Sequence, residues 1–137
     1  MGRIVGGFAT SHIMFSRTGV ESQADRILNS FQAMRTRLKE LRPDVVVIVS
    51  TEHGPTMPPL GPQPSLAIGW GEQLRTFGDI GLPVVRVPGH RGFAAGLLAA
   101  GRQAGYELAP IEDFVADHGV AFPLLMLMPE HSTPVVP

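Results

Sequence analysis

The sequence contains no cysteine and no long hydrophobic run. Without cysteine there can be no disulfides, zinc ribbons, iron–sulfur clusters or thiol nucleophiles, so histidine and carboxylate side chains must hold any metal. No stretch approaches the roughly 18 uninterrupted apolar residues of a transmembrane helix, and the N-terminus lacks the apolar core of a secretory signal. We therefore expect a soluble, cytoplasmic protein.

Charge is also scarce. Charged residues make up 17% of the chain, and 11 basic against 12 acidic side chains give a net charge of −1. This balance provides no electrostatic reason to expect nucleic acid or an anionic membrane as partner, which leaves a small molecule or another protein. With 137 residues, 44% of them hydrophobic, residues 1–137 can form a single domain with its own core.

The first fifty residues predict a strand, a helix and a second strand. Arg3–Thr10 has the apolar content of a strand, and apolar residues at spacings of four and three predict a helix over about Ala24–Leu41. Val45–Val49 is a continuous β-branched run typical of a strand buried on both faces of a parallel sheet. We expect a right-handed βαβ unit with its helix packed across two parallel strands, in an α/β fold with a mostly parallel sheet and flanking helices.

The remainder is less regular, because prolines and glycines cluster between Gly54 and Gly92. We interpret this segment as loop-like, with two short extended pieces. The elements expected after residue 54 are extended segments at Leu66–Ile68 and Leu82–Val87, a helix over Phe93–Ala104 ending at Gly105, a short strand at Tyr106–Ala109, a helix opened by Pro123 and running to Met128, and the beginning of an uncompleted strand at Val135 and Val136.

Two of the five histidines follow the predicted strands of the βαβ unit, His12 after the first and His53 after the second. The carboxyl ends of parallel strands meet at one edge of the sheet, so these imidazoles can face one another and hold a divalent metal. The alternative is that each histidine caps its strand or bonds a nearby carbonyl. Glu52 precedes His53 and points to the opposite side, so we expect it to be a supporting or structural carboxylate.

A third histidine lies in the turn-like tripeptide Asp117-His118-Gly119. This is either an ordinary polar turn or a turn that presents His118 to the same crevice, with Asp117 orienting His118 or a neighbouring group. His90 is interpreted as structural, and His131, in a polar tail, is assigned no role.

Together these pieces resemble the catalytic subunit of the class III extradiol dioxygenases, the family of protocatechuate 4,5-dioxygenase and gallate dioxygenase. The matching motifs occur in the family's order through nearly all of the chain. They are Ser11-His12-Ile13, Glu52-His53 after VVVIV, Leu66-Ala67-Ile68-Gly69, Val87-Pro88-Gly89-His90, and Asp117-His118-Gly119 followed by Val120, Pro123 and Leu124.

The resemblance implies a non-haem Fe(II) held by two histidines and one glutamate, with open positions for substrate and oxygen. His12 and His53 match the two histidine ligands. His118 matches a histidine beside the substrate, which makes it the catalytic candidate of this chain. The implied reaction inserts both atoms of O2 into a catechol-type aromatic diol and cleaves the ring adjacent to the two hydroxyls.

The chain departs from the family in length, because family members are about twice as long and their glutamate ligand and main acid–base histidine lie in the second half. We therefore expect an N-terminal half and an incomplete domain that forms homo-oligomers or pairs with a complementary chain. It can be a fragment, one half of a split protein, or a shortened homologue without the activity. The competing functions are a non-catalytic or other-metal-binding relative acting as an interaction protein, and a plain α/β domain with unoccupied histidines.

Overall fold

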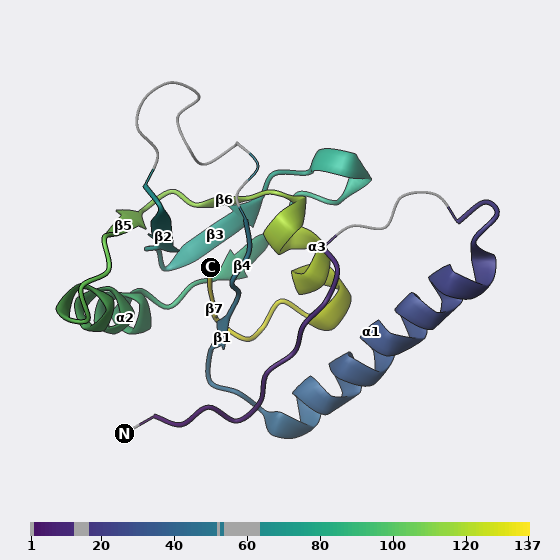
Figure 1. Cartoon of the computed structure of the whole chain (residues 1–137), viewed down its shortest axis with the longest axis horizontal. Coiled ribbons are helices and arrows are strands. Elements are labelled where there is room, and N and C mark those ends of the chain that lie inside the picture. Colours follow the sequence, from purple (N-terminus) through teal and green to yellow (C-terminus); the bar gives the residue numbers. More distant parts are fainter. Residues whose placement is uncertain (1, 13–16, 52, 54–63) are drawn as a thin grey trace.

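The computed structural model describes residues 2–12, 17–51, 53 and 64–137 (Figure 1). Strands occupy the middle of the molecule, with α2 at one end and α1 and α3 at the other. In chain order the elements are α1 (Glu21–Leu41), β1 (Val46–Val47), β2 (Leu66–Gly69), β3 (Gln73–Thr76), the 3-10 turn η1 (Asp79–Gly81), β4 (Arg86–Pro88), α2 (Arg91–Gln103), β5 (Leu108–Ile111), β6 (Val115–Ala116), α3 (His118–Leu127) and β7 (Val135–Val136).

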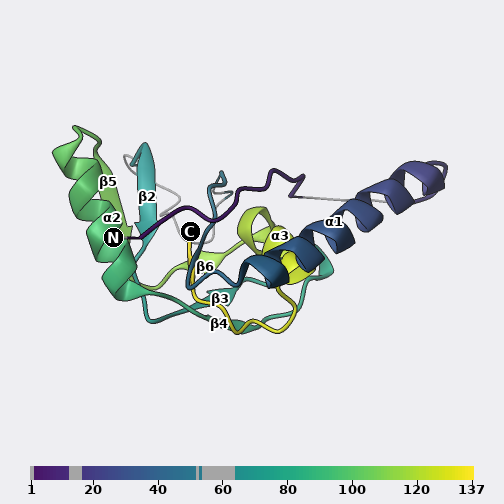
Figure 2. The ribbon, with the colours of Figure 1, turned by 90° about the horizontal axis from the view of Figure 1, so that it is seen from below.

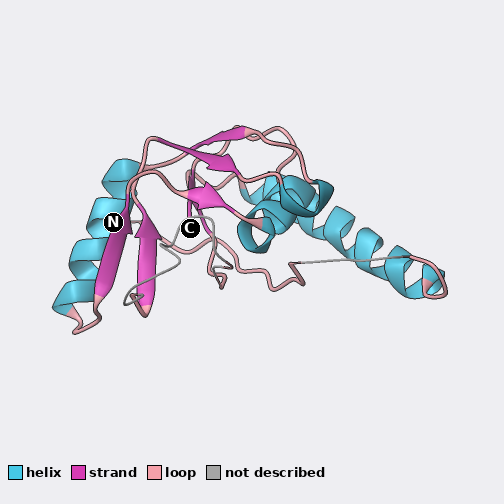
Figure 3. Ribbon diagram, turned by 90° about the horizontal axis from the view of Figure 1, so that it is seen from above, coloured by secondary structure: helices cyan, strands magenta, loops and turns pink. Residues whose placement is uncertain are grey.

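The strands form three small sheets, and most of the pairings are parallel. β1 pairs with β7, and β2 with β5, both in parallel. β3 pairs in parallel with β6 and antiparallel with β4. Figure 3 shows these sheets lying between the helices. The fold is therefore α/β with a mostly parallel arrangement, as the sequence predicted.

The N-terminal segment is not the strand that we expected. Residues 2–11 are exposed and contain no strand, and Ile4 is 94% exposed. The segment runs past the C-terminal end of α1 toward α3 (Figures 1 and 2), so close that a Cβ on Gly6 would lie 2.7 Å from Leu41 Cδ1. The predicted pairing with Val45–Val49 is therefore wrong, and β1 pairs instead with Val135 and Val136, which lie far away in the sequence.

The VVVIV run is only partly buried, with Val45 half-buried against the cluster of β2 and α2. Val46 and Ile48 pack against the core, whereas Val49 is 94% exposed. The backbone amides of Val46 and Ile48 donate to the carbonyls of Pro134 and Val136, which continues the parallel pairing with β7. The expectation of burial on both faces is therefore wrong beyond Val46, since Val47 and Val49 are exposed whereas Ile48 packs against the core.

The helical stripe predicted α1 correctly, but this helix packs mainly on α3 rather than across a pair of strands. The Phe31 and Phe122 rings meet edge to face at 5.6 Å, and Arg35 Nε donates to the Met126 carbonyl at 2.9 Å. The N-terminal half of α1 projects beyond the rest of the molecule (Figures 2 and 3).

The final helix begins five residues before Pro123, which we had expected to open it. Asp117 caps the helix by accepting from the Gly119 amide, so the helix already starts at His118. Within the helix Pro123 cannot donate to the Gly119 carbonyl. That carbonyl instead accepts from the hydroxyl of Ser50 at 2.9 Å, which satisfies the acceptor and ties α3 to the segment after β1.

The middle of the chain is more regular than its composition indicated. β2 confirms the extended piece at Leu66–Ile68, and β4 lies at the end of the piece predicted at Leu82–Val87. α2 confirms the alanine-rich helix, followed by Gly105 at φ 89. β3 and β6 were missed, because each is too short to show a periodic pattern.

The core has two parts joined by β7. Val135 packs with β3, β4, β6 and α3, and Val136 packs with β2 and α2. Successive residues of a strand point to opposite sides, so two adjacent valines serve both clusters. None of the helices in the described ranges is long and apolar enough to span a bilayer.

Candidate active site

Three histidines from distant parts of the sequence converge at one place. One ring nitrogen from each of His12, His53 and His118 lies within 4.8 Å of one from each of the others. The ring centroids are 5.3 Å apart for His12 and His53, 5.8 Å for His12 and His118, and 4.5 Å for His53 and His118. Two rings on one ion have centroids about 4.5–6 Å apart, because each metal–nitrogen bond is about 2 Å long.

His53 is held by the buried carboxylate of Asp117, which is 1% exposed. Oδ2 of Asp117 accepts from the His53 backbone amide at 2.7 Å and lies 2.9 Å from its Nδ1. Oδ1 accepts from the Gly119 amide at the start of α3. One carboxylate thus caps the helix and orients the imidazole. Of the two roles considered for Asp117, it orients the neighbouring group, His53.

His118 is held in the same manner by Asp79. Oδ2 of Asp79 accepts from the His118 amide at 3.2 Å and lies 2.5 Å from Nδ1. Burial raises the pKa of the Asp79 carboxyl, but the hydrogen bonds from the ring and amide of His118, with the charge of the ring, hold this pKa below its usual value. Sequence reasoning missed Asp79, which lies 39 residues before its partner.

In both aspartate–histidine contacts it is Nδ1 of the ring that faces the carboxylate. With Nδ1 facing a carboxylate, Nε2 is the nitrogen of His53 and of His118 that remains for a metal or a substrate. A carboxylate that bonds the far nitrogen of an imidazole fixes the ring and raises its basicity, as around histidine ligands of metals. The site therefore suits a divalent cation that accepts imidazole nitrogen.

Among the described residues, two further polar side chains, those of His90 and Glu112, lie outside this cluster. Glu52 lies outside the described residues. His90 caps α2, accepting from the Phe93 amide at its Nδ1, which confirms its structural interpretation. Glu112 forms an ion pair with Arg91 at 2.9 Å. In the part of the chain that the structure describes, the group of three histidines is the one that could hold a metal.

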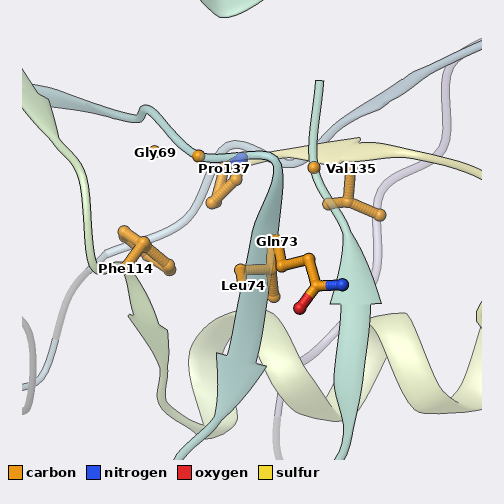
Figure 4. Close-up of a pocket in the computed structure, with 8 residues that line it drawn as sticks. Gly69, Gln73, Leu74, Phe114, Val135 and Pro137 are labelled. Atoms are coloured by element: carbon orange, nitrogen blue, oxygen red, sulfur yellow. The ribbon is translucent and has the colours of Figure 1, made fainter. Parts of the chain in front are cut away.

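Two hollows in the described part of the surface are not lined by these histidines. One small hollow is lined by residues of the β2–β3 connection, Phe114 and the C-terminal residues Val135 and Pro137 (Figure 4), with no histidine. A second, open hollow of about 310 Å³ lies between residues 9–11 and α1. Neither contains a titratable cluster comparable to the three histidines.

A family model described as the catalytic LigB subunit of aromatic ring-opening dioxygenase matches residues 7–137. The chain belongs to this family. A comparison with curated proteins gave no significant match. The residues matched by the family model include the three converging histidines and the two aspartates that hold His53 and His118. The site therefore lies in the part of the chain that shows the family. The resemblance noted in the motifs is thereby confirmed, and the family is one of dioxygenases that open aromatic rings.

Proposed function

We propose that this chain carries the metal-binding half of an Fe(II)-dependent extradiol dioxygenase acting on a catechol-type aromatic diol and O2. The observation that supports this most is the convergence of three imidazoles, two of them fixed by carboxylates, within the region that matches the family. A plain structural cluster would not need both rings to turn Nδ1 toward a carboxylate.

In this proposal His12 and His53 hold the iron. Neutral imidazole is a suitable ligand for Fe(II), and Asp117 keeps the Nδ1 of His53 occupied so that Nε2 can coordinate. Bound iron would supply a cation for the two neighbouring oxygens of the diol and the redox chemistry that O2 requires.

His118 acts on the substrate rather than on the metal. Its Nε2 can accept the proton of a diol hydroxyl: the O–H bond breaks, an N–H bond forms, and the oxygen keeps the electron pair. Asp79 then faces the imidazolium that results. Because catechol hydroxyls ionise more easily than alcohols, a histidine is a suitable base for this step.

The third protein ligand is proposed to come from a second half or a complementary chain. Exposed apolar side chains, among them Ile4, Val47 and Val49, support such a partner or a second copy of this chain. That the chain is the N-terminal half of a larger domain stays a prediction. Light scattering should show that the chain self-associates or pairs with an added complementary half, and a chain that stays monomeric in both experiments would contradict the proposal.

Metal binding tests the proposal directly. Anaerobic Fe(II) titration, followed by a catechol and O2, should give a yellow ring-opened product when the partner half is present. His12→Ala and His53→Ala should each weaken Fe(II) binding by at least about 100-fold in calorimetry, because each removes a ligand. His90→Asn is the matched control, since it removes an imidazole and keeps a good helix cap. Wild-type affinity in both alanine variants would refute the assignment.

A further inference from the structure

Asp79 contacts His118 through two atoms at once. The same oxygen, Oδ2, accepts from the backbone amide and faces Nδ1 of the ring, so the carboxylate fixes both the main chain and the imidazole of His118. The two side chains are largely buried, at 20% and 16% exposed. At such burial the ring has little freedom to turn away without breaking the contact.

The backbone that carries Asp79 adopts an unfavourable conformation. Gly78 and Gly81 have φ of 89° and 81°, and Ile80 between them has φ of 47°. A β-branched residue in the left-handed region is an outlier, and such conformations persist where the surroundings impose them, often at functional sites. Ile80 is 53% exposed, so burial of its own side chain does not explain the turn. The turn places the carboxylate of Asp79 against the amide and the ring of His118.

The second oxygen of Asp79 adds to the cost of placing a carboxylate here. Oδ1 is buried and has no hydrogen-bond partner among the described residues. A buried carboxylate oxygen without a partner is costly, and selection for stability alone would favour replacing it. The contacts of the other oxygen, Oδ2, with His118 offset this cost.

A second pair of residues repeats the geometry. Asp117 bonds the amide and Nδ1 of His53 as Asp79 bonds those of His118, and the two rings stack at 4.5 Å with 25° between their planes. The two aspartates come from different elements, η1 and the N-cap of α3. Two independent carboxylates therefore set two neighbouring imidazoles in one orientation.

We propose that Asp79 is a positioning residue, which holds His118 as the Nδ1–H tautomer with the Nε2 lone pair directed at the site. The role of that lone pair as proton acceptor rests on the proposed function; the orientation of the ring does not. Without Asp79, Nε2 can carry the proton and the ring can turn. His118 would then meet a diol hydroxyl with a donor instead of an acceptor.

The tautomer of His118 provides the first test. Long-range ¹H–¹⁵N spectra of the metal-free chain, recorded above the usual histidine pKa of about 6.5, distinguish protonated from bare ring nitrogens. His118→Gln identifies the signals. The wild type should show Nδ1–H at His118, and Asp79→Ala should convert it to a mixture or to Nε2–H. Asp79→Asn should keep Nδ1–H, because the amide oxygen can accept both bonds that Oδ2 accepts. Asp113→Ala removes an exposed carboxylate and should change nothing.

Turnover of the iron-loaded protein with its partner half provides the second test. Asp79→Ala should lower kcat about 10–100-fold with KM within about twofold of wild type, and Asp79→Asn should recover most of the loss. An unchanged His118 tautomer in Asp79→Ala would overturn the proposal whatever the activity. A tautomer that follows Asp79 in a protein without ring-opening activity would leave this proposal standing and refute the proposed function instead.

Discussion

Replacing Asp117 by alanine should destabilise the protein and weaken its metal site together. The side chain is 1% exposed and accepts three hydrogen bonds, from the Gly119 amide and from the amide and Nδ1 of His53. Loss of a helix cap costs about 1 kcal/mol. Bonds to a charged acceptor contribute about 1.5–3 kcal/mol each, but the His53 side chain is 36% exposed and can recover part of this from water. The expected loss is therefore about 2–4 kcal/mol, below the plain sum.

Urea unfolding followed by circular dichroism measures this loss, and calorimetry with Fe(II) should show about 10–100-fold weaker binding. Asp117→Asn should keep the cap and lose part of the contact with His53, so its stability should lie between alanine and wild type. Asp113→Ala is the control, because it removes an exposed carboxylate four residues away and should change stability by less than about 0.5 kcal/mol. If Asp117→Ala is no less stable than this control, Asp117 does not link α3 to His53.

Three further predictions concern the segment from β3 to η1. Thr76 is fully buried and its hydroxyl bonds one backbone carbonyl and one backbone amide, so Thr76→Val should cost about 1–3 kcal/mol in urea unfolding, and a neutral result would contradict these bonds. Ile80→Gly should be neutral or raise stability by up to about 1 kcal/mol, because glycine adopts φ of 47° without a steric penalty; a clear loss would show that the Ile80 side chain stabilises the turn. The pKa of Asp79 is lowered in the folded chain, so its stabilising effect is fully present above the unfolded pKa of about 3.9 and is lost as pH falls through the folded value. Below about pH 4 the wild type should therefore lose stability more steeply than Asp79→Asn, and parallel curves would exclude a contribution from the ionised Asp79–His118 pair.

Local patterns were enough for α1 and α2 and for the three histidines of the site. The stripe through Phe31 and Leu38 predicted α1, and the alanine-rich segment before Gly105 predicted α2, because helical periodicity can be seen within a few turns. The positions of His12, His53 and His118 in their motifs indicated one shared site. The rings do converge, although His12 comes from a segment without the predicted strand.

The sequence by itself determined that any metal would be held without cysteine, that the fold would be α/β, and that three histidines were candidates for the site. Only the tertiary structure decided which segment of the chain pairs with β1 and which aspartate carboxylate holds each histidine ring. β7 lies beside β1, and Asp79 reaches His118 from 39 residues away. The physical reason is range: periodicity and capping act within a few residues, whereas strand pairing and carboxylate–imidazole contacts depend on how the core brings distant segments together.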